Sequence, residues 1–162
     1  MALSLPSWLL IVPLAWLALS LVGERWLAAR RPPEGRWRGR LLNLGLAGIN
    51  FVGLRLALPA GLATVAARFG DAIWGGPLLP SWLTWLMLDL GLYLQHRAMH
   101  RWQWAWRMHA AHHADTHIDA TTGLRFHPLE IAASTLWKSV LIVALGAPVP
   151  VVIGFEFVLL IG

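Results

Sequence analysis

The apolar residues of this sequence come in long runs that short polar segments separate. These runs occupy residues 5–22, 41–67, 78–94 and about 128–145. A helix of about 20 apolar residues is long enough to cross the hydrocarbon core of a bilayer. The pattern therefore predicts an all-α fold, an integral membrane helical bundle.

A basic linker, residues 23–40, separates the first two runs. Pro32 and Pro33 predict that no continuous helix passes through it. The linker contains six arginines: Arg25, Arg30, Arg31, Arg36, Arg38 and Arg40. Because basic loops beside membrane helices stay in the cytoplasm, we place the linker there. Counting spans from it brings the polar segment 95–127 to the same side, so the net charge of +5 reflects topology and not nucleic-acid binding.

The composition agrees with a membrane protein. Hydrophobic residues make up 57% of the chain and charged residues 13%, whereas soluble domains carry about 25% charged residues. The eleven tryptophans fit as well, and Trp102, Trp104 and Trp106 are expected to form an interfacial belt. The absence of cysteine excludes a thiolate metal site, so any transition metal must bind imidazole or carboxylate.

All seven histidines lie between residues 96 and 127. His96 and His100 share one helix face at a spacing of four, and His109 stands in the same relation to His113, with His112 beside it. Polar groups at a membrane boundary are costly unless they are used, so the cluster predicts a metal site on the cytoplasmic side. A pH-sensing patch is the alternative.

Two histidine-containing segments resemble a known family. Asp89-Leu-Gly-Leu-Tyr-Leu-Gln-His96-Arg-Ala-Met-His100 resembles the first histidine box of the fatty acid hydroxylase / sterol desaturase superfamily, and Trp106-Arg-Met-His109-Ala-Ala-His112-His113 resembles the second. The stretch 119–130 is similar to the segment that follows in bacterial members. The resemblance covers about residues 82–156, so we divide the chain into an N-terminal membrane region, 1–78, and a hydroxylase-like domain, 79–162.

The resemblance implies a membrane-bound non-haem di-iron oxidoreductase. Such an enzyme uses molecular oxygen and an electron donor to hydroxylate or desaturate a lipid in lipid biosynthesis, here in a multi-pass protein of the bacterial inner membrane. It implies two iron ions and the metal ligands His96, His100, His109, His112, His113 and His127. The family also has a third box of the type H-x-x-H-H, which these residues do not contain. Since Val151–Gly162 is also shorter than a membrane span, we expect the natural polypeptide to continue beyond Gly162.

Other polar residues allow more than one interpretation. Asp89, two turns before His96, could accept a hydrogen bond from a liganding imidazole or pair with Arg55 or Asn50 of the second run. Tyr93, one turn from Asp89, is expected to hydrogen-bond it.

The remaining candidates are assigned simpler roles. His117 is expected to be structural or exposed, and His127 either caps the helix that Pro128 begins or binds metal. Asp115, Asp119 and Glu130 could bind metal, but solvated or capping roles are favoured.

A second class of function is a membrane electron-transfer protein in which two histidines bind haem. Only general features support this function, namely helices, histidines and the absence of cysteine. The sequence also contains more histidines than a haem needs as ligands. A membrane zinc peptidase is disfavoured because the sequence contains no H-E-x-x-H.

Overall fold

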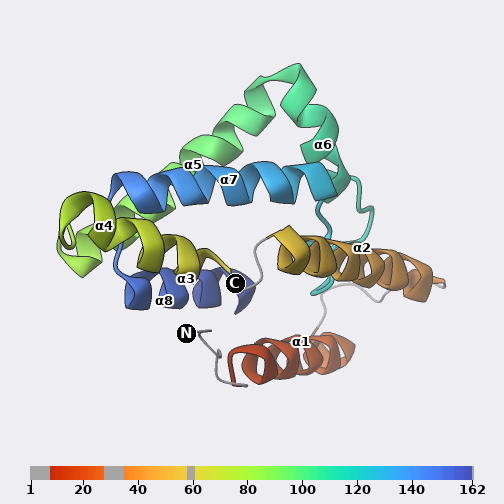
Figure 1. Cartoon of the computed structure of the whole chain (residues 1–162). Coiled ribbons are helices and arrows are strands. Elements are labelled where there is room, and N and C mark those ends of the chain that lie inside the picture. Colours follow the sequence, from red (N-terminus) through yellow and green to blue (C-terminus); the bar gives the residue numbers. More distant parts are fainter. Residues whose placement is uncertain (1–7, 28–34, 58–60, 162) are drawn as a thin grey trace.

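The computed structural model describes residues 8–27, 35–57 and 61–161, and every element in these ranges is helical (Figure 1). The prediction of an all-α fold is confirmed there. The elements are α1 (Trp8–Leu27), α2 (Arg36–Ala57), α3 (Leu62–Val65), a π-helical turn (Ala66–Gly70), α4 (Asp71–Trp74), α5 (Ser81–Arg101), α6 (Gln103–His113), a 3₁₀ turn (Thr122–Leu124), α7 (Pro128–Ala144) and α8 (Val149–Ile161).

The buried apolar core lies where α3, α5, α7 and α8 meet. Leu62 of α3, Leu88 of α5, Ile142 of α7 and Phe155 of α8 are all at most 5% exposed. Figure 1 shows α7 crossing the centre of the molecule, α8 and α3 beneath it, and α5 rising to a tip where it meets α6. The core therefore fixes one end of α5, and the histidines lie toward the other end.

Two helices differ in extent from the apolar runs of the sequence. The third run was expected to end near Leu94, but α5 continues to Arg101 and so carries the first histidine pair. The run 41–67 was expected to be one helix, but Gly61 has a φ of 68° and a non-helical backbone before α3 begins. A positive φ lies outside the right-handed helical region, so Gly61 interrupts the run before α3.

The basic linker is more helical than expected. α1 continues to Leu27 and α2 already begins at Arg36, so both helices extend into residues 23–40. Pro32 and Pro33 lie outside the described residues. Because α2 begins at Arg36, the last arginines of the linker lie on a helix face.

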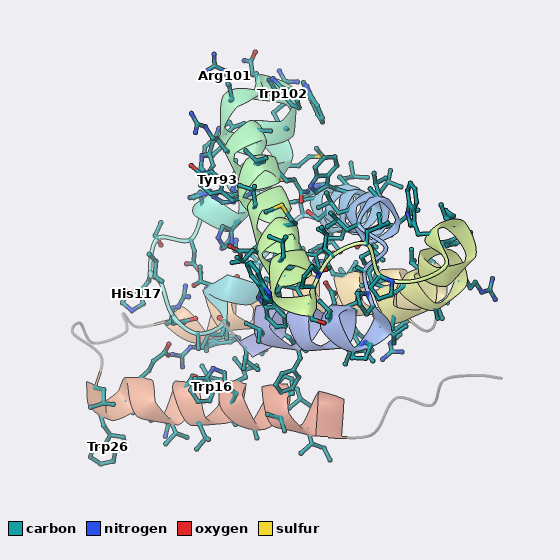
Figure 2. The ribbon with its side chains drawn as sticks, turned by 90° about the vertical axis from the view of Figure 1, so that its left-hand side faces the viewer. Trp16, Trp26, Tyr93, Arg101, Trp102 and His117 are labelled. Atoms are coloured by element: carbon teal, nitrogen blue, oxygen red, sulfur yellow. The ribbon has the colours of Figure 1, made fainter. Side chains whose placement is uncertain are left out.

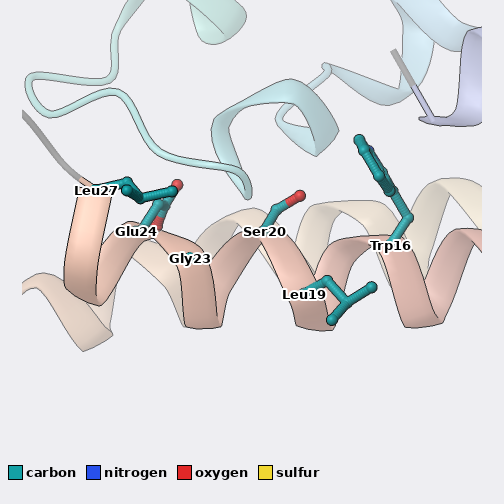
Figure 3. A pocket seen from close by; sticks show the side chains of 6 residues that line it. All are labelled: Trp16, Leu19, Ser20, Gly23, Glu24 and Leu27. Carbon is teal, nitrogen blue, oxygen red and sulfur yellow. The ribbon is translucent and has the colours of Figure 1, made fainter.

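By length and composition, the stretch Arg36–Gly70 is a candidate membrane span, and the described residues contain one such stretch. Large apolar side chains are also exposed along α1, including Leu14, Leu19 and Trp26 (Figure 2). An open groove follows the same helix and is lined by Trp16, Leu19, Ser20, Gly23, Glu24 and Leu27. Figure 3 shows Trp16, Ser20 and Glu24 pointing from α1 toward the loop after α6.

A glycine sets the closest approach of α5 to α7. A Cβ at Gly91 would lie 2.3 Å from Leu141 Cδ1. The indole Nε1 of Trp137 also donates a hydrogen bond of 3.0 Å to the Gly91 carbonyl oxygen. At Gly91 the two helices therefore touch through the backbone of α5, whereas further along the Gln95 side chain of α5 donates a hydrogen bond to Ser134 of α7.

We predict that Gly91→Ala destabilises the protein because Leu141 must move. The matched control is Gly45→Ala, since a Cβ at Gly45 meets nothing within 4 Å and alanine favours helix. Overpacking of this kind costs about 1–3 kcal/mol in the free energy of unfolding. Thermal unfolding in detergent should give a lower midpoint for Gly91→Ala than for the control. Equal midpoints would show that the two helices do not pack as described.

Candidate metal centre

A sharp turn between α5 and α6 brings the two histidine boxes together. Trp102 has an extended backbone (φ −97°, ψ 120°) and serves both as the C-cap of α5 and as the N-cap of α6. Its N–H donates to the Ala98 carbonyl oxygen, and its own carbonyl oxygen accepts from the Trp106 N–H. One residue thus ends the first helix and starts the second, so that each helix presents a histidine pair to the other.

Four histidines form one cluster: His96 and His100 from α5, and His109 and His113 from α6. One nitrogen from each lies within 4.8 Å of all the others. Within the pairs, the Nε2–Nε2 distance is 3.1 Å for His96 and His100 and 3.2 Å for His109 and His113. The spacing of four residues therefore produces the shared helix faces that the sequence predicted.

The donor set fits a transition metal ion. Imidazole nitrogens bind such ions at about 2.1 Å, so ligands of one ion lie roughly 3–4 Å apart. The spacing in the cluster is close to this range. Burial and the neighbouring imidazoles, His109 first, lower the pKa of His96, which favours the neutral form that coordinates metal.

Glu130 holds the most buried histidine of the cluster. His109 is 1% exposed, and its Nδ1 lies 2.6 Å from Oε1 of Glu130, which is 3% exposed. Burial, followed by the charges of His113 and His100, lowers the pKa of His109 to about 4, so the imidazole is neutral at pH 7. We assign its proton to Nδ1, because a carboxylate accepts it there. The Nε2 lone pair then faces the other three histidines.

The sequence interpretation of Glu130 as a solvated or capping residue was wrong. It lies in the first turn of α7, where acidic residues commonly stabilise the helix dipole, and nothing local distinguishes it from such a residue. The available signal was the resemblance of the stretch 119–130, which ends at this residue, to the family. A carboxylate that orients a liganding histidine is a recurrent feature of metal sites.

His112 lies beside the cluster and not in it. Its ring stacks on Phe126 with centroids 4.7 Å apart and planes at 4°. Burial lowers its pKa, and its Nδ1 is buried without a hydrogen-bond partner among the described residues. Oε2 of Glu130 is also buried and unpartnered there. Two polar atoms near the cluster therefore have unused bonding capacity, which is unusual unless a ligand uses it.

The other two histidines lie outside the four-histidine group. His127 is the N-cap of α7, and its Nδ1 accepts a hydrogen bond of 3.2 Å from the Leu129 N–H. Of the two roles expected for His127, the structure shows the cap. His117 lies in the loop after α6 (Figure 2), and its backbone N–H donates to Asp115.

Asp89 and Tyr93 do not join the histidines. Both side chains are exposed, and within the described residues neither makes a hydrogen bond to a histidine. No hydrogen bond joins Asp89 to Tyr93 in that part of the chain either. The carboxylate that contacts a cluster histidine is Glu130, on a different helix from Asp89.

Asp115 and Asp119 were expected to be solvated or capping; they are buried and not solvated, and each accepts a hydrogen bond from a nearby backbone N–H, of His117 and of Thr121. Each side chain is 3% exposed and paired with Arg36 of α2. A hydrogen bond from Arg36 keeps the pKa of Asp115 well below its usual range. Burial raises the pKa of Asp119, but hydrogen bonds from Arg36, Thr121 and Arg40 together hold it below its usual value.

The comparisons with known proteins agree with this site. No solved structure was found to match the chain. The family model described as fatty acid hydroxylase matches residues 81–162, which is half of the chain and contains both histidine pairs, Glu130 and the loop between them. The chain belongs to the fatty acid hydroxylase family.

Proposed function

We propose that this protein is a membrane-bound non-haem di-iron oxidoreductase that hydroxylates or desaturates a lipid with molecular oxygen. The observation that carries the proposal is the cluster of four histidines, with His109 oriented by Glu130, inside the segment that matches the family. Neutral imidazoles suit iron among other transition metals. When bound, a pair of iron ions supplies oxygen-dependent oxidation of an unactivated C–H bond.

The residues of the chain would bind the metal ions and orient the ligands. The four-histidine cluster is suited to one ion, and the unpartnered Nδ1 of His112 is a donor beside it for the second. Glu130 holds the His109 proton at Nδ1 and so keeps Nε2 available. Trp106 packs on the cluster, with its ring centroid 5.2 Å from that of His100 and 5.5 Å from that of His113.

The surface supports a lipid environment and a lipid substrate. Buried residues make up 6% of the most apolar window within Arg36–Gly70. In the core helix of a soluble protein most residues would be buried. Exposed apolar side chains on α1 and α5 add to this surface. We therefore propose a multi-pass protein, in a bacterial inner membrane, with the histidine cluster on the cytoplasmic side and an electron donor arriving from there.

Haem electron transfer is the less favoured function. The imidazole centroids of His96, His100 and His109 lie 4.7–4.9 Å apart, and a porphyrin would have to fit between two such rings. In these three pairs the rings stand closer together than two axial ligands on opposite faces of one haem would.

We predict that the purified protein contains about two irons per chain after expression in iron-replete medium, and that its absorption spectrum lacks a Soret band. His109→Ala should remove most of the iron because it deletes the buried ligand. His117→Ala is the matched control, since that histidine lies outside the cluster, and should keep the wild-type content. Metal analysis measures both. Stoichiometric zinc without iron would contradict the iron assignment, and a Soret band would favour haem.

We predict that Glu130→Gln weakens metal binding, because the amide no longer holds the His109 proton at Nδ1 as a carboxylate does. Loss of such a partner typically costs about 10–100-fold in metal affinity. Asp89→Asn removes an exposed carboxylate from α5 and should leave the affinity unchanged. Competition with a chelator measures both dissociation constants. A larger effect of Asp89→Asn would restore the assignment of Asp89 as the residue that orients a histidine.

We predict that residues 38 and 103 lie on the same, cytoplasmic side. The contact of 2.6 Å between Arg36 and Asp115 supports this, because it joins the linker to the histidine segment. The chain contains no cysteine, so single cysteines at Arg38, Gln103 and Leu78 can be probed with an impermeant thiol reagent in intact cells. Position 78 should react and the other two should not. Labelling of position 38 or 103 from outside would overturn the topology.

A further inference from the structure

One face of α2 carries polar residues from Arg36 to Asn50. Arg36, Arg40, Asn43 and Asn50 follow one another at spacings of four, three and seven, which places them on one side of the helix. Each of these side chains contacts the segment 115–126 that links α6 to α7. The helix that begins the candidate span Arg36–Gly70 thus turns a polar stripe toward the loop that links α6 to α7.

Arg36 makes the most hydrogen bonds to the loop among these four residues. Its Nη1 and Nη2 donate to the two carboxylate oxygens of Asp115 at 2.6 and 2.9 Å, and its Nε donates to Oδ2 of Asp119 at 2.7 Å. The Arg36 side chain is 8% exposed. A planar guanidinium that donates to two carboxylates at once fixes their relative position. A lysine ammonium does this less well.

Asn43 extends the contact to the middle of the loop. Its Nδ2 donates to Oδ2 of Asp115 at 3.1 Å and to the Thr121 hydroxyl oxygen at 3.0 Å, and both Asn43 and Thr121 are 0% exposed. Further along α2, Asn50 donates to the carbonyl oxygen of Phe126 at 2.9 Å.

Charge balance also holds the loop in place. Arg40 bridges Asp119 and Glu24 of α1, and Arg125 lies 4.0 Å from Asp115. Three arginines therefore meet three carboxylates. Removing one partner from such a buried group leaves a charge without compensation, which is strongly unfavourable.

Both ends of the loop are connected to the histidine cluster. Asp115 follows His113 by two residues, and the other end leads through the His127 cap into the turn of α7 that carries Glu130. Phe126, whose carbonyl is held by Asn50, stacks on His112. A shift of the loop would therefore move His113 and the carboxylate that orients His109.

We propose that Arg36 is a positioning residue for the metal centre, acting through the loop 114–127. The inference rests on the metal centre of the proposed function and adds to it a residue outside the segment 81–162 that matches the family. The N-terminal region is thus part of the site's construction, and the histidine boxes depend on α2 for their geometry.

The test compares Arg36→Met with Arg38→Met in the purified full chain. Arg38 is an exposed arginine two residues away that stacks on the neighbouring Trp37 ring, so its replacement removes the same charge without touching the loop. Cobalt(II) is the probe, because its visible spectrum reports coordination geometry. Hydrogen–deuterium exchange gives a second measurement that needs no metal. Arg36→Lys keeps the charge but not the fork.

Arg36→Met should weaken cobalt binding by about tenfold or more and alter its spectrum, Arg36→Lys should fall between it and wild type, and Arg38→Met should match wild type. Exchange in Arg36→Met should quicken in residues 109–113 and 128–132 while α5 and α8 keep their protection. If Arg36→Met does not fold, Arg36→Lys and Asn43→Ala are judged by the same criteria.

Three results would overturn the proposal: wild-type cobalt binding and exchange in Arg36→Met, equal losses in Arg38→Met, or faster exchange throughout the chain, which indicates a general structural role. If the wild-type protein binds no cobalt, the proposed metal function fails, and exchange at residues 109–113 and 128–132 still decides the positioning role.

Discussion

The hydrogen bond between His109 Nδ1 and Glu130 Oε1 attaches α6 to α7, while the apolar core holds α5. α5 and α6 meet at an exposed tip, and α6 is anchored where its buried histidine reaches the first turn of α7. Both groups are almost fully excluded from solvent, so either one without the other would be an unpaired polar group in the interior. This pairing fixes the imidazole's orientation, and His96, His100 and His113 gather around the nitrogen that it leaves free.

The described arginines of the linker fall into two groups. Arg38 is exposed, which agrees with the proposed cytoplasmic location of the linker. Arg36 and Arg40 are instead matched by Asp115, Asp119 and other acids inside the protein. The number of basic residues therefore overstates how strongly the linker favours one side of the membrane. The ion pairs of Arg36 and Arg40 nevertheless support the same side for the linker and the histidine segment, because they join the linker to the loop after α6.

Local patterns in the sequence predicted the helices and the histidine pairs, because both depend on spacing along one helix. The cluster of His96, His100, His109 and His113 needs little more than two i, i+4 pairs and a turn. Glu130 could not be identified this way, since its role depends on the placement of α7 against α6. Arg36 was missed for the same reason: an arginine in a basic loop and one that holds two buried carboxylates look alike until the loop's partner is known.

X-ray absorption at the iron edge of the iron-loaded protein tests the central claim most directly. Imidazole ligands produce characteristic outer-shell scattering, and their number per iron can be fitted. Several imidazoles per iron, reduced in His109→Ala and unchanged in His117→Ala, is the result that this account predicts. A first shell of oxygen ligands without imidazole scattering would show that the iron binds elsewhere and that the four-histidine cluster is not the metal centre.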